Sequence, residues 1–353
     1  MTLDNTAVLD KLRSGEVLVS DGATGTFLQQ NGLEPGGDPE EFNMSHPEVV
    51  RRMAKEYFDA GSDIVLTNSF GGTVFRQSHY GYGNKVREFN TLAAQHARSQ
   101  APNDRFVFGS VGPTGEFLEP LGTIKESEMY QAFKTQVTAL EEGGADGVVI
   151  ETMTAMEEAE LAIKATKENT SLVIAATMTF DKGPKGYFTM MGITPEKAAQ
   201  GLSEAGADIV GTNCGNGIDN MLEITQRMRQ STNKPLLVHS NAGIPGMEKG
   251  EIIYPESPEF MAERFMKLKD VGATNIIKKL SILQKKLSIL DFSNNLIEGA
   301  KEFHEALNKE DMKNLTELNL SECKLKDDGA AAIIKALSQF EKINSLDFSG
   351  NQD

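Results

Sequence analysis

The feature that most constrains the fold is a phrase that recurs along the first 277 residues. A helix-like segment ends in glycine, an apolar run follows, and polar residues come next. The phrase reads DAGSDIVLTNSF at 59–70, EGGADGVVIETM at 142–153, EAGADIVGTNCG at 204–215 and DVGATNII at 270–277. Each glycine predicts a helix end with left-handed backbone, and each run rich in Val and Ile predicts a buried strand.

Four further apolar runs bring the expected number of strands to eight. They are EVLVSDG at 16–22, RFVFGSVG at 105–112, SLVIAATMTF at 171–180 and PLLVHSN at 235–241, with amphipathic segments between them. Strict alternation of strands and helices predicts a parallel sheet. Eight such units in about 250 residues favour an α/β fold of the closed (β/α)8 type, the TIM barrel. An open doubly wound sheet is the alternative, weakened because no G-x-G-x-x-G follows the first strand.

From residue 278 the pattern changes. KKLSIL occurs at 278–283 and again at 285–290, and Leu290, Leu318 and Leu346 are then spaced by 28 residues. This spacing is typical of a leucine-rich repeat. The segment GAAAIIKALSQF at 329–340 would supply the helix of such a repeat. We therefore expect a barrel at 1–277 and a short C-terminal leucine-rich repeat α/β segment at 278–353.

Composition narrows the classes of function. The formal net charge is −16, which argues against nucleic acid and against an anionic membrane surface as partners. No uncharged apolar stretch is long enough to span a bilayer, and the N-terminus lacks the pattern of a secretory signal. The two cysteines, Cys214 and Cys323, make no disulfide framework, so we expect a cytoplasmic protein.

In barrels of this kind, catalytic groups follow the strands at their carboxyl ends. The strings in these places are DGATGT at 21–26, TNSFGG at 67–72, GSVGPTG at 109–115, IETM at 150–153, TMTF at 177–180, TNCGNG at 212–217 and HSNAG at 239–243. Several combine glycine, which lets a ligand approach the backbone, with a polar side chain that can orient it.

These seven strings, in this order, resemble the homocysteine-binding barrel of the homocysteine S-methyltransferases. The family includes the homocysteine module of cobalamin-dependent methionine synthase and betaine–homocysteine methyltransferase. The resemblance implies transfer of a methyl group from a corrinoid-bound or onium donor to the zinc-activated thiol of homocysteine, giving methionine. It implies zinc as cofactor, with corrinoid or cobalamin as a methyl carrier on a partner protein.

The resemblance also assigns roles to residues of this sequence. Cys214 matches the first zinc ligand of the family, and Asn241 matches a catalytic asparagine beside the metal. Asp21 and Glu151 match acidic residues near the ammonium group of homocysteine, and Glu151 is also expected to be catalytic. Ala23 and Thr24 lie where backbone amides would receive the carboxylate. Zinc held by three thiolates keeps a fourth position for the substrate thiol, whose pKa is otherwise about 8.5.

Each of these positions also has a purely structural interpretation. Cys214 could be a small buried side chain, and Asp21, before Gly22, could be a turn residue. Glu151 could be a paired carboxylate and Asn241 a loop hydrogen bonder. His239 is expected to be a core histidine with its hydrogen bonds satisfied.

The sequence departs from the family after the eighth strand. There the family carries its other two zinc ligands in a Gly-Gly-Cys-Cys-Gly string, whereas here Ile277 is followed by KKLSIL. One thiolate does not hold a structured zinc site, so we expect the pocket to survive and zinc-dependent transfer to be impaired. Two other hypotheses are a non-catalytic barrel scaffold with a protein-binding repeat tail, and an accidental or constructed join of two coding segments.

Overall fold

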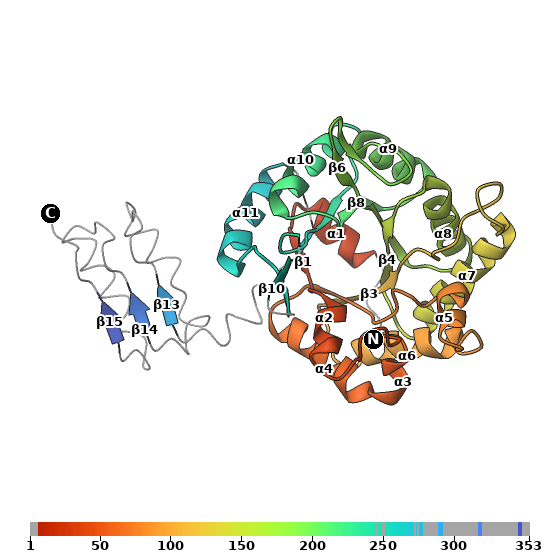
Figure 1. Cartoon of the computed structure of the whole chain (residues 1–353), viewed down its shortest axis with the longest axis horizontal. Coiled ribbons are helices and arrows are strands. Elements are labelled where there is room, and N and C mark those ends of the chain that lie inside the picture. The colour runs from red at the N-terminus through yellow and green to blue at the C-terminus, as the bar shows by residue number, and fades with distance from the viewer. Residues whose placement is uncertain are drawn as a thin grey trace. The chain divides into compact units, whose positions relative to one another are not determined.

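The computed structural model describes residues 6–244, 246–248, 251–271, 273, 275–277, 289–291, 317–319 and 345–347. They fall into two compact units, Met1–Lys279 and Leu280–Asp353 (Figure 1). The first unit holds the barrel, and the second holds three short strands.

Eight parallel strands form a closed barrel in the first unit, and each comes from one of the eight apolar runs. β1 completes the ring by pairing with β12 on one side and with β2 on the other, which excludes an open sheet. In order around the ring, the strands are β1 (Leu18–Ser20), β2 (Ile64–Leu66), β3 (Phe106–Val111), β4 (Gly147–Met153), β5 (Val173–Met178), β8 (Ile209–Asn213), β9 (Leu236–His239) and β12 (Asn275–Ile277).

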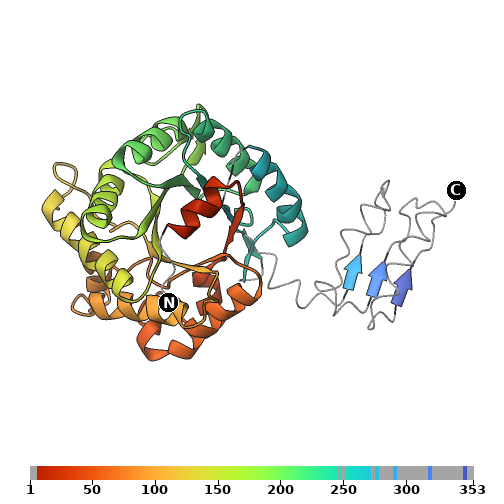
Figure 2. The same cartoon turned by 180° about the vertical axis from the view of Figure 1, so that it is seen from behind.

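Helices surround this ring in Figures 1 and 2. The outer helices are α4 (Pro47–Asp59), α6 (Val86–Arg98), α7 (Glu126–Glu142), α8 (Met156–Asn169), α9 (Pro195–Ala205), α10 (Ile218–Arg229) and α11 (Pro258–Asp270). Shorter elements precede β1 or lie in the loops that follow the strands. They are α1 (Ala7–Arg13), α2 (Thr24–Gln29), α3 (Phe42–Ser45), α5 (Val74–His79), and the hairpins β6 (Asp181–Gly183)–β7 (Gly186–Phe188) and β10 (Gly246–Glu248)–β11 (Glu251–Ile253).

The glycines of the first three occurrences of the repeated phrase end their helices as predicted, and Gly272 of the fourth lies outside the described residues. Gly61, Gly144 and Gly206 follow α4, α7 and α9, and all three have φ between 97° and 108°. A side chain there would meet the following carbonyl, so glycine lets the chain turn sharply from helix into strand.

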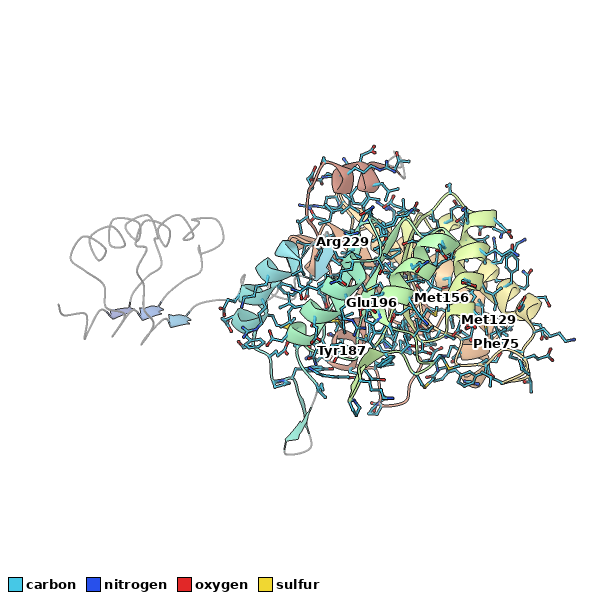
Figure 3. The ribbon with its side chains drawn as sticks, turned by 90° about the horizontal axis from the view of Figure 1, so that it is seen from above. Phe75, Met129, Met156, Tyr187, Glu196 and Arg229 are labelled. Atoms are coloured by element: carbon cyan, nitrogen blue, oxygen red, sulfur yellow. The ribbon has the colours of Figure 1, made fainter. Side chains whose placement is uncertain are left out.

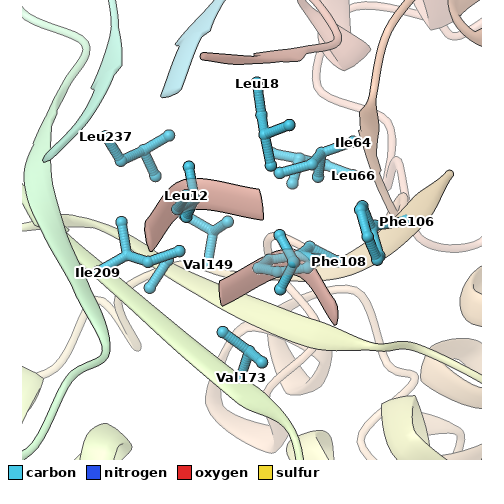
Figure 4. Packing of buried hydrophobic residues seen from close by; sticks show 12 residues of the cluster. Leu12, Leu18, Ile64, Leu66, Phe106, Phe108, Val149, Val173, Ile209 and Leu237 are labelled. Carbon is cyan, nitrogen blue, oxygen red and sulfur yellow. The ribbon is translucent and has the colours of Figure 1, made fainter. Parts of the chain in front are cut away.

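The barrel interior is filled by apolar side chains that alternate along the strands. Leu18, Leu66, Phe108 and Leu237 belong to this cluster (Figure 4), which Leu12 and Val8 of α1 extend. Helix α1 lies across one end of the ring in Figure 2, so its apolar face closes the end where the strands begin. In Figure 3 the hairpin β10–β11 projects from the opposite end. The carboxyl ends of the strands therefore form the open mouth.

The second unit contains three parallel strands, β13 (Ile289–Asp291), β14 (Glu317–Asn319) and β15 (Ser345–Asp347). Leu290 pairs with Leu318, and Leu318 with Leu346, so the leucines spaced by 28 residues are in register. The doubled KKLSIL up to residue 288, the predicted helix at 329–340 and Cys323 lie outside the described residues.

Within the part of the chain that the structure describes, none of the helices has the length and apolar character needed to cross a bilayer.

Candidate functional site

A cavity of about 560 Å3 lies at the carboxyl ends of the strands. Its walls come from segments that are far apart in sequence but follow neighbouring strands. All six residues that the sequence pointed to line it, namely Asp21, Ala23, Thr24, Glu151, Cys214 and Asn241. The mouth of the barrel thus brings them together in one space.

Glu151 lies near the end of β4, where the pairing register with β5 shifts between Ile150 and Met153. The hydroxyl of Ser110 donates to Glu151 Oε1 at 2.6 Å, and Asn213 Nδ2 donates to Oε2 at 3.2 Å. Burial raises the pKa of Glu151 from 4.5 to about 7. None of these partners is a cation that would lower the pKa again, so Glu151 can gain or lose a proton near neutral pH.

Asp21 follows β1 and is 2% exposed. Its Oδ2 accepts a hydrogen bond from the backbone N–H of Leu66 in β2 at 2.7 Å. Burial, together with the charge of Glu151, raises the pKa of Asp21 to about 8. A simple turn aspartate would be solvated, so the interpretation of Asp21 as a turn residue is not supported. Gly22 next to it packs closely, because a Cβ there would lie 3.0 Å from the Tyr57 hydroxyl and that ring would have to shift by a few tenths of an ångström.

Ala23 and Thr24 form the start of α2 on the same side of the cavity. Ala23 is the N-cap residue and has no side-chain cap, so the first amides of the helix keep donor capacity. The Tyr57 hydroxyl donates to the carbonyl of Ala23 at 3.0 Å and holds this turn in place.

Cys214 follows β8 as a free, half-buried thiol. Its φ is +57°, and Thr152, whose Oγ1 lies 4.0 Å from Cys214 Sγ, has φ +62°. Such values are rare outside glycine, especially for a β-branched residue, and each costs about 1–3 kcal/mol. Burial and the charge of Glu151 both raise the pKa of the Cys214 thiol. Two strained residues therefore meet at one point of the cavity wall.

His239 ends β9 and Asn241 lies just after it, and both line the cavity. The backbone N–H of Asn241 donates to the carbonyl of Asn216 at 3.2 Å, and the carbonyl of His239 accepts from Cys214 N at 3.0 Å. His239 is 6% exposed, and its Nε2 has no hydrogen-bond partner among the described residues. His239 is therefore buried as expected, but its Nε2 does not have the expected hydrogen bond. Burial lowers the pKa of His239 to about 4, so the ring is neutral at pH 7.

Sequence reasoning missed the residue with the most hydrogen bonds in the wall, Asn213. Besides Glu151, its amide contacts Thr152 twice, and its Oδ1 accepts from Thr177 Oγ1 at 2.7 Å. The available signal was strand parity, because Ser110 and Thr177 each follow a residue of the interior cluster by two positions, and Asn213 follows Ile209 by four.

The side chains present do not fit a zinc ion. No group of three His, Cys, Asp or Glu side chains among the described residues is placed to hold a metal. The whole sequence has only two cysteines, and Cys323 belongs to the other unit. Structural and catalytic zinc sites take at least three protein ligands, which Cys214 alone does not supply.

The mouth also carries exposed apolar side chains. Among the residues that the structure describes, each large apolar residue found exposed lies between the carboxyl end of a barrel strand and the next outer helix. These are Met44, Phe70, Val74, Tyr80, Tyr82, Phe117, Leu121, Met190, Met191, Ile244 and Tyr254, which we call the apolar rim. Exposed apolar side chains that gather at one end of a fold are typical of an interaction site.

Comparison with known proteins gives two family matches. A family model described as homocysteine S-methyltransferase matches residues 18–277, and one described as leucine-rich repeat matches residues 311–333. Methionine synthase of Mycobacterium tuberculosis is 29% identical over 280 residues, covering 74% of this chain and 23% of that protein. Betaine–homocysteine S-methyltransferase 1 of Sus scrofa is 33% identical over 215 residues, covering 59% of this chain and 74% of that protein.

The chain therefore spans about a quarter of the length of that methionine synthase, and 51% of the betaine–homocysteine S-methyltransferase 1 of Danio rerio. Among solved structures, the metallated form of the homocysteine methyltransferase MmuM from Escherichia coli has a TM-score of 0.65 at 19% identity. The match covers 80% of this chain and 100% of that one, and it shows a shared fold.

Proposed function

The chain belongs to the homocysteine S-methyltransferase family, and from this premise we propose that its cavity binds homocysteine and presents the thiol for methyl transfer, giving methionine. The observation that carries the proposal is the convergence of Glu151 in β4 with residues of the loops that follow β1, β8 and β9 on one cavity of about 560 Å3. That space is ample for an amino acid and part of a methyl donor.

In the proposed complex, Asp21 and Glu151 receive the ammonium group. Asp21 is buried and Glu151 is half-buried, and neither has a cationic partner among the described residues, so a bound ammonium would favour their ionised forms. The free amides at the start of α2, at Ala23 and Thr24, receive the carboxylate. The side chain of the ligand would then extend toward Cys214 and Asn241.

In the proposed reaction, the sulfur of homocysteine forms a bond to the methyl carbon while the bond from that carbon to the donor breaks. The thiol proton passes to solvent. Since the side chains of the cavity do not fit a zinc ion, no step is assigned to a metal. The reaction then depends on the fraction of homocysteine that is already a thiolate, about 3% at pH 7. Methyl transfer by this chain should therefore be slow.

The methyl donor is either corrinoid-bound or an onium compound, and the apolar rim favours a donor carried on a protein partner. A small diffusing donor would need no ring of exposed apolar side chains around the mouth, whereas a docked domain would bury them. The proposed partner is a corrinoid protein that covers the rim and delivers its methyl group into the cavity.

Lysine substitutions in the rim test this partner. Phe117→Lys with Leu121→Lys should weaken association with a methylcorrinoid protein at least tenfold, because two exposed apolar contacts become charged. Sedimentation velocity measures the association, and homocysteine affinity should stay unchanged. Gln131→Lys, on the exposed face of α7, is the matched control. Equal association of all three proteins would rule out a docking role for the rim.

Titration calorimetry with reduced L-homocysteine tests the substrate. Glu151→Gln keeps the shape of the side chain but removes the negative charge, so homocysteine affinity should fall at least tenfold. Glu168→Gln removes an exposed carboxylate of α8 and should change nothing. A wild-type chain that does not bind homocysteine would disprove the proposed function.

For the chain as a whole, we propose a barrel module at 1–277, a leucine-rich repeat segment at 278–353 and a cytoplasmic location. The alternative remains a barrel that acts only as a scaffold, with the repeat segment binding a protein partner. That alternative is favoured if the chain binds a protein through residues 278–353 while homocysteine binding is absent.

A further inference from the structure

The irregularity in β4 has a chemical consequence at the cavity. The register shift at Glu151 and Thr152 and the left-handed φ of Thr152 turn its backbone N–H toward the side chain of Asn213, 2.8 Å from Oδ1. A backbone N–H can only donate, so the atom that it meets must be the amide oxygen. The hydroxyl of Thr177 donates to the same oxygen at 2.7 Å.

These two donors fix which way the Asn213 amide points. Its NH2 group must face the opposite side, where it donates to Glu151 Oε2 at 3.2 Å and to Thr152 Oγ1 at 2.7 Å. Ser110 donates to the other oxygen of Glu151 at 2.6 Å. Asn213 and Ser110 are 1% and 4% exposed, so water does not compete for these bonds.

We propose that Ser110 and Asn213 are positioning residues that hold the Glu151 carboxylate as a receptor for an ammonium group, so that the cavity selects α-amino thiols over simple thiols. Each carboxylate oxygen receives one donor, which fixes its plane and leaves lone pairs directed at the cavity. The strained backbone of Thr152 is the feature that sets which way the side-chain amide of Asn213 faces. This proposal rests on the proposed function and adds two residues to its substrate site.

A pair of ligands that differ only in the ammonium group tests it. Homocysteine and 4-mercaptobutanoate share the thiol and the carboxylate, and calorimetry gives both dissociation constants for each variant. Ser110→Ala and Asn213→Ala should each weaken homocysteine about tenfold and leave 4-mercaptobutanoate within about twofold. Ser110→Thr keeps the hydroxyl and should restore the preference. Thr166→Val, which removes a buried hydroxyl bonded to Ala162 far from the cavity, is the control.

The outcomes separate this proposal from the one on which it rests. If the wild-type chain binds neither ligand, the proposed function itself fails. If it prefers homocysteine and both alanine variants keep that preference, only the positioning role is wrong. A parallel loss of both ligands would mean that Ser110 and Asn213 merely maintain the shape of the wall, which also overturns the inference. Retained binding of 4-mercaptobutanoate shows that a variant has kept its cavity folded.

Discussion

At the residue scale, the cavity holds carboxyl groups whose ionised form the folded chain stabilises poorly. Asp21 is 2% exposed and has no cation beside it, and its pKa rises from 3.8 to about 8. The folded-state pKa thus lies above the unfolded one, so the native chain binds the proton more tightly. The tighter binding of this proton contributes fully to the stability of the fold below pH 3.8, and the contribution is lost as pH rises toward 8.

Asp21→Asn should therefore stabilise the chain without its ligand. The amide is neutral at every pH and its oxygen can still accept from Leu66 N. We expect a gain of up to about 4 kcal/mol at pH 7, shrinking toward zero at pH 4. Urea unfolding of the wild-type chain and of the Asp21→Asn variant at pH 4 and pH 7 measures this gain in stability. A gain that is equal at pH 4 and pH 7 would contradict the role assigned to the buried charge.

At the element scale, α1 closes the barrel at the end opposite to the cavity. Leu12 is 5% exposed and packs into the interior cluster with Leu18 and Ile64. Leu12→Ala should lower the free energy of unfolding by about 2–4 kcal/mol, since it removes buried methyl groups and leaves a void. Lys11→Ala, at a partly exposed position of the same helix, should change it by less than about 0.5 kcal/mol. Chemical denaturation of the two variants provides the comparison, and equal stabilities would mean that α1 does not support the barrel.

At the scale of the whole molecule, the chain combines a complete cavity with an incomplete set of zinc ligands. Wild-type protein should hold far less than one zinc per chain after dialysis, because one thiolate is available at the mouth. Inserting Gly-Gly-Cys-Cys-Gly after Ile277 should raise the content toward one, and Cys214→Ser in that variant should abolish the gain. Atomic absorption measures the metal. Stoichiometric zinc in the wild-type chain would refute this account, and an inserted chain without zinc would refute the location of the site.

The sequence by itself determined the ring of strands and the list of residues at its mouth. Apolar runs with period and length typical of buried strands, and glycines at the helix ends, are local signals that do not depend on distant contacts. Parallel strands carry their carboxyl ends to one face, so the sequence alone predicts Asp21, Glu151 and Cys214 in a single cavity. Only the tertiary structure decided how they behave there. The raised pKa values of Asp21 and Glu151 and the orientation of Asn213 depend on which groups face each side chain across neighbouring strands. The same holds for His239 Nε2, which has no hydrogen-bond partner among the residues that the structure describes. No local pattern in the sequence specifies those neighbours.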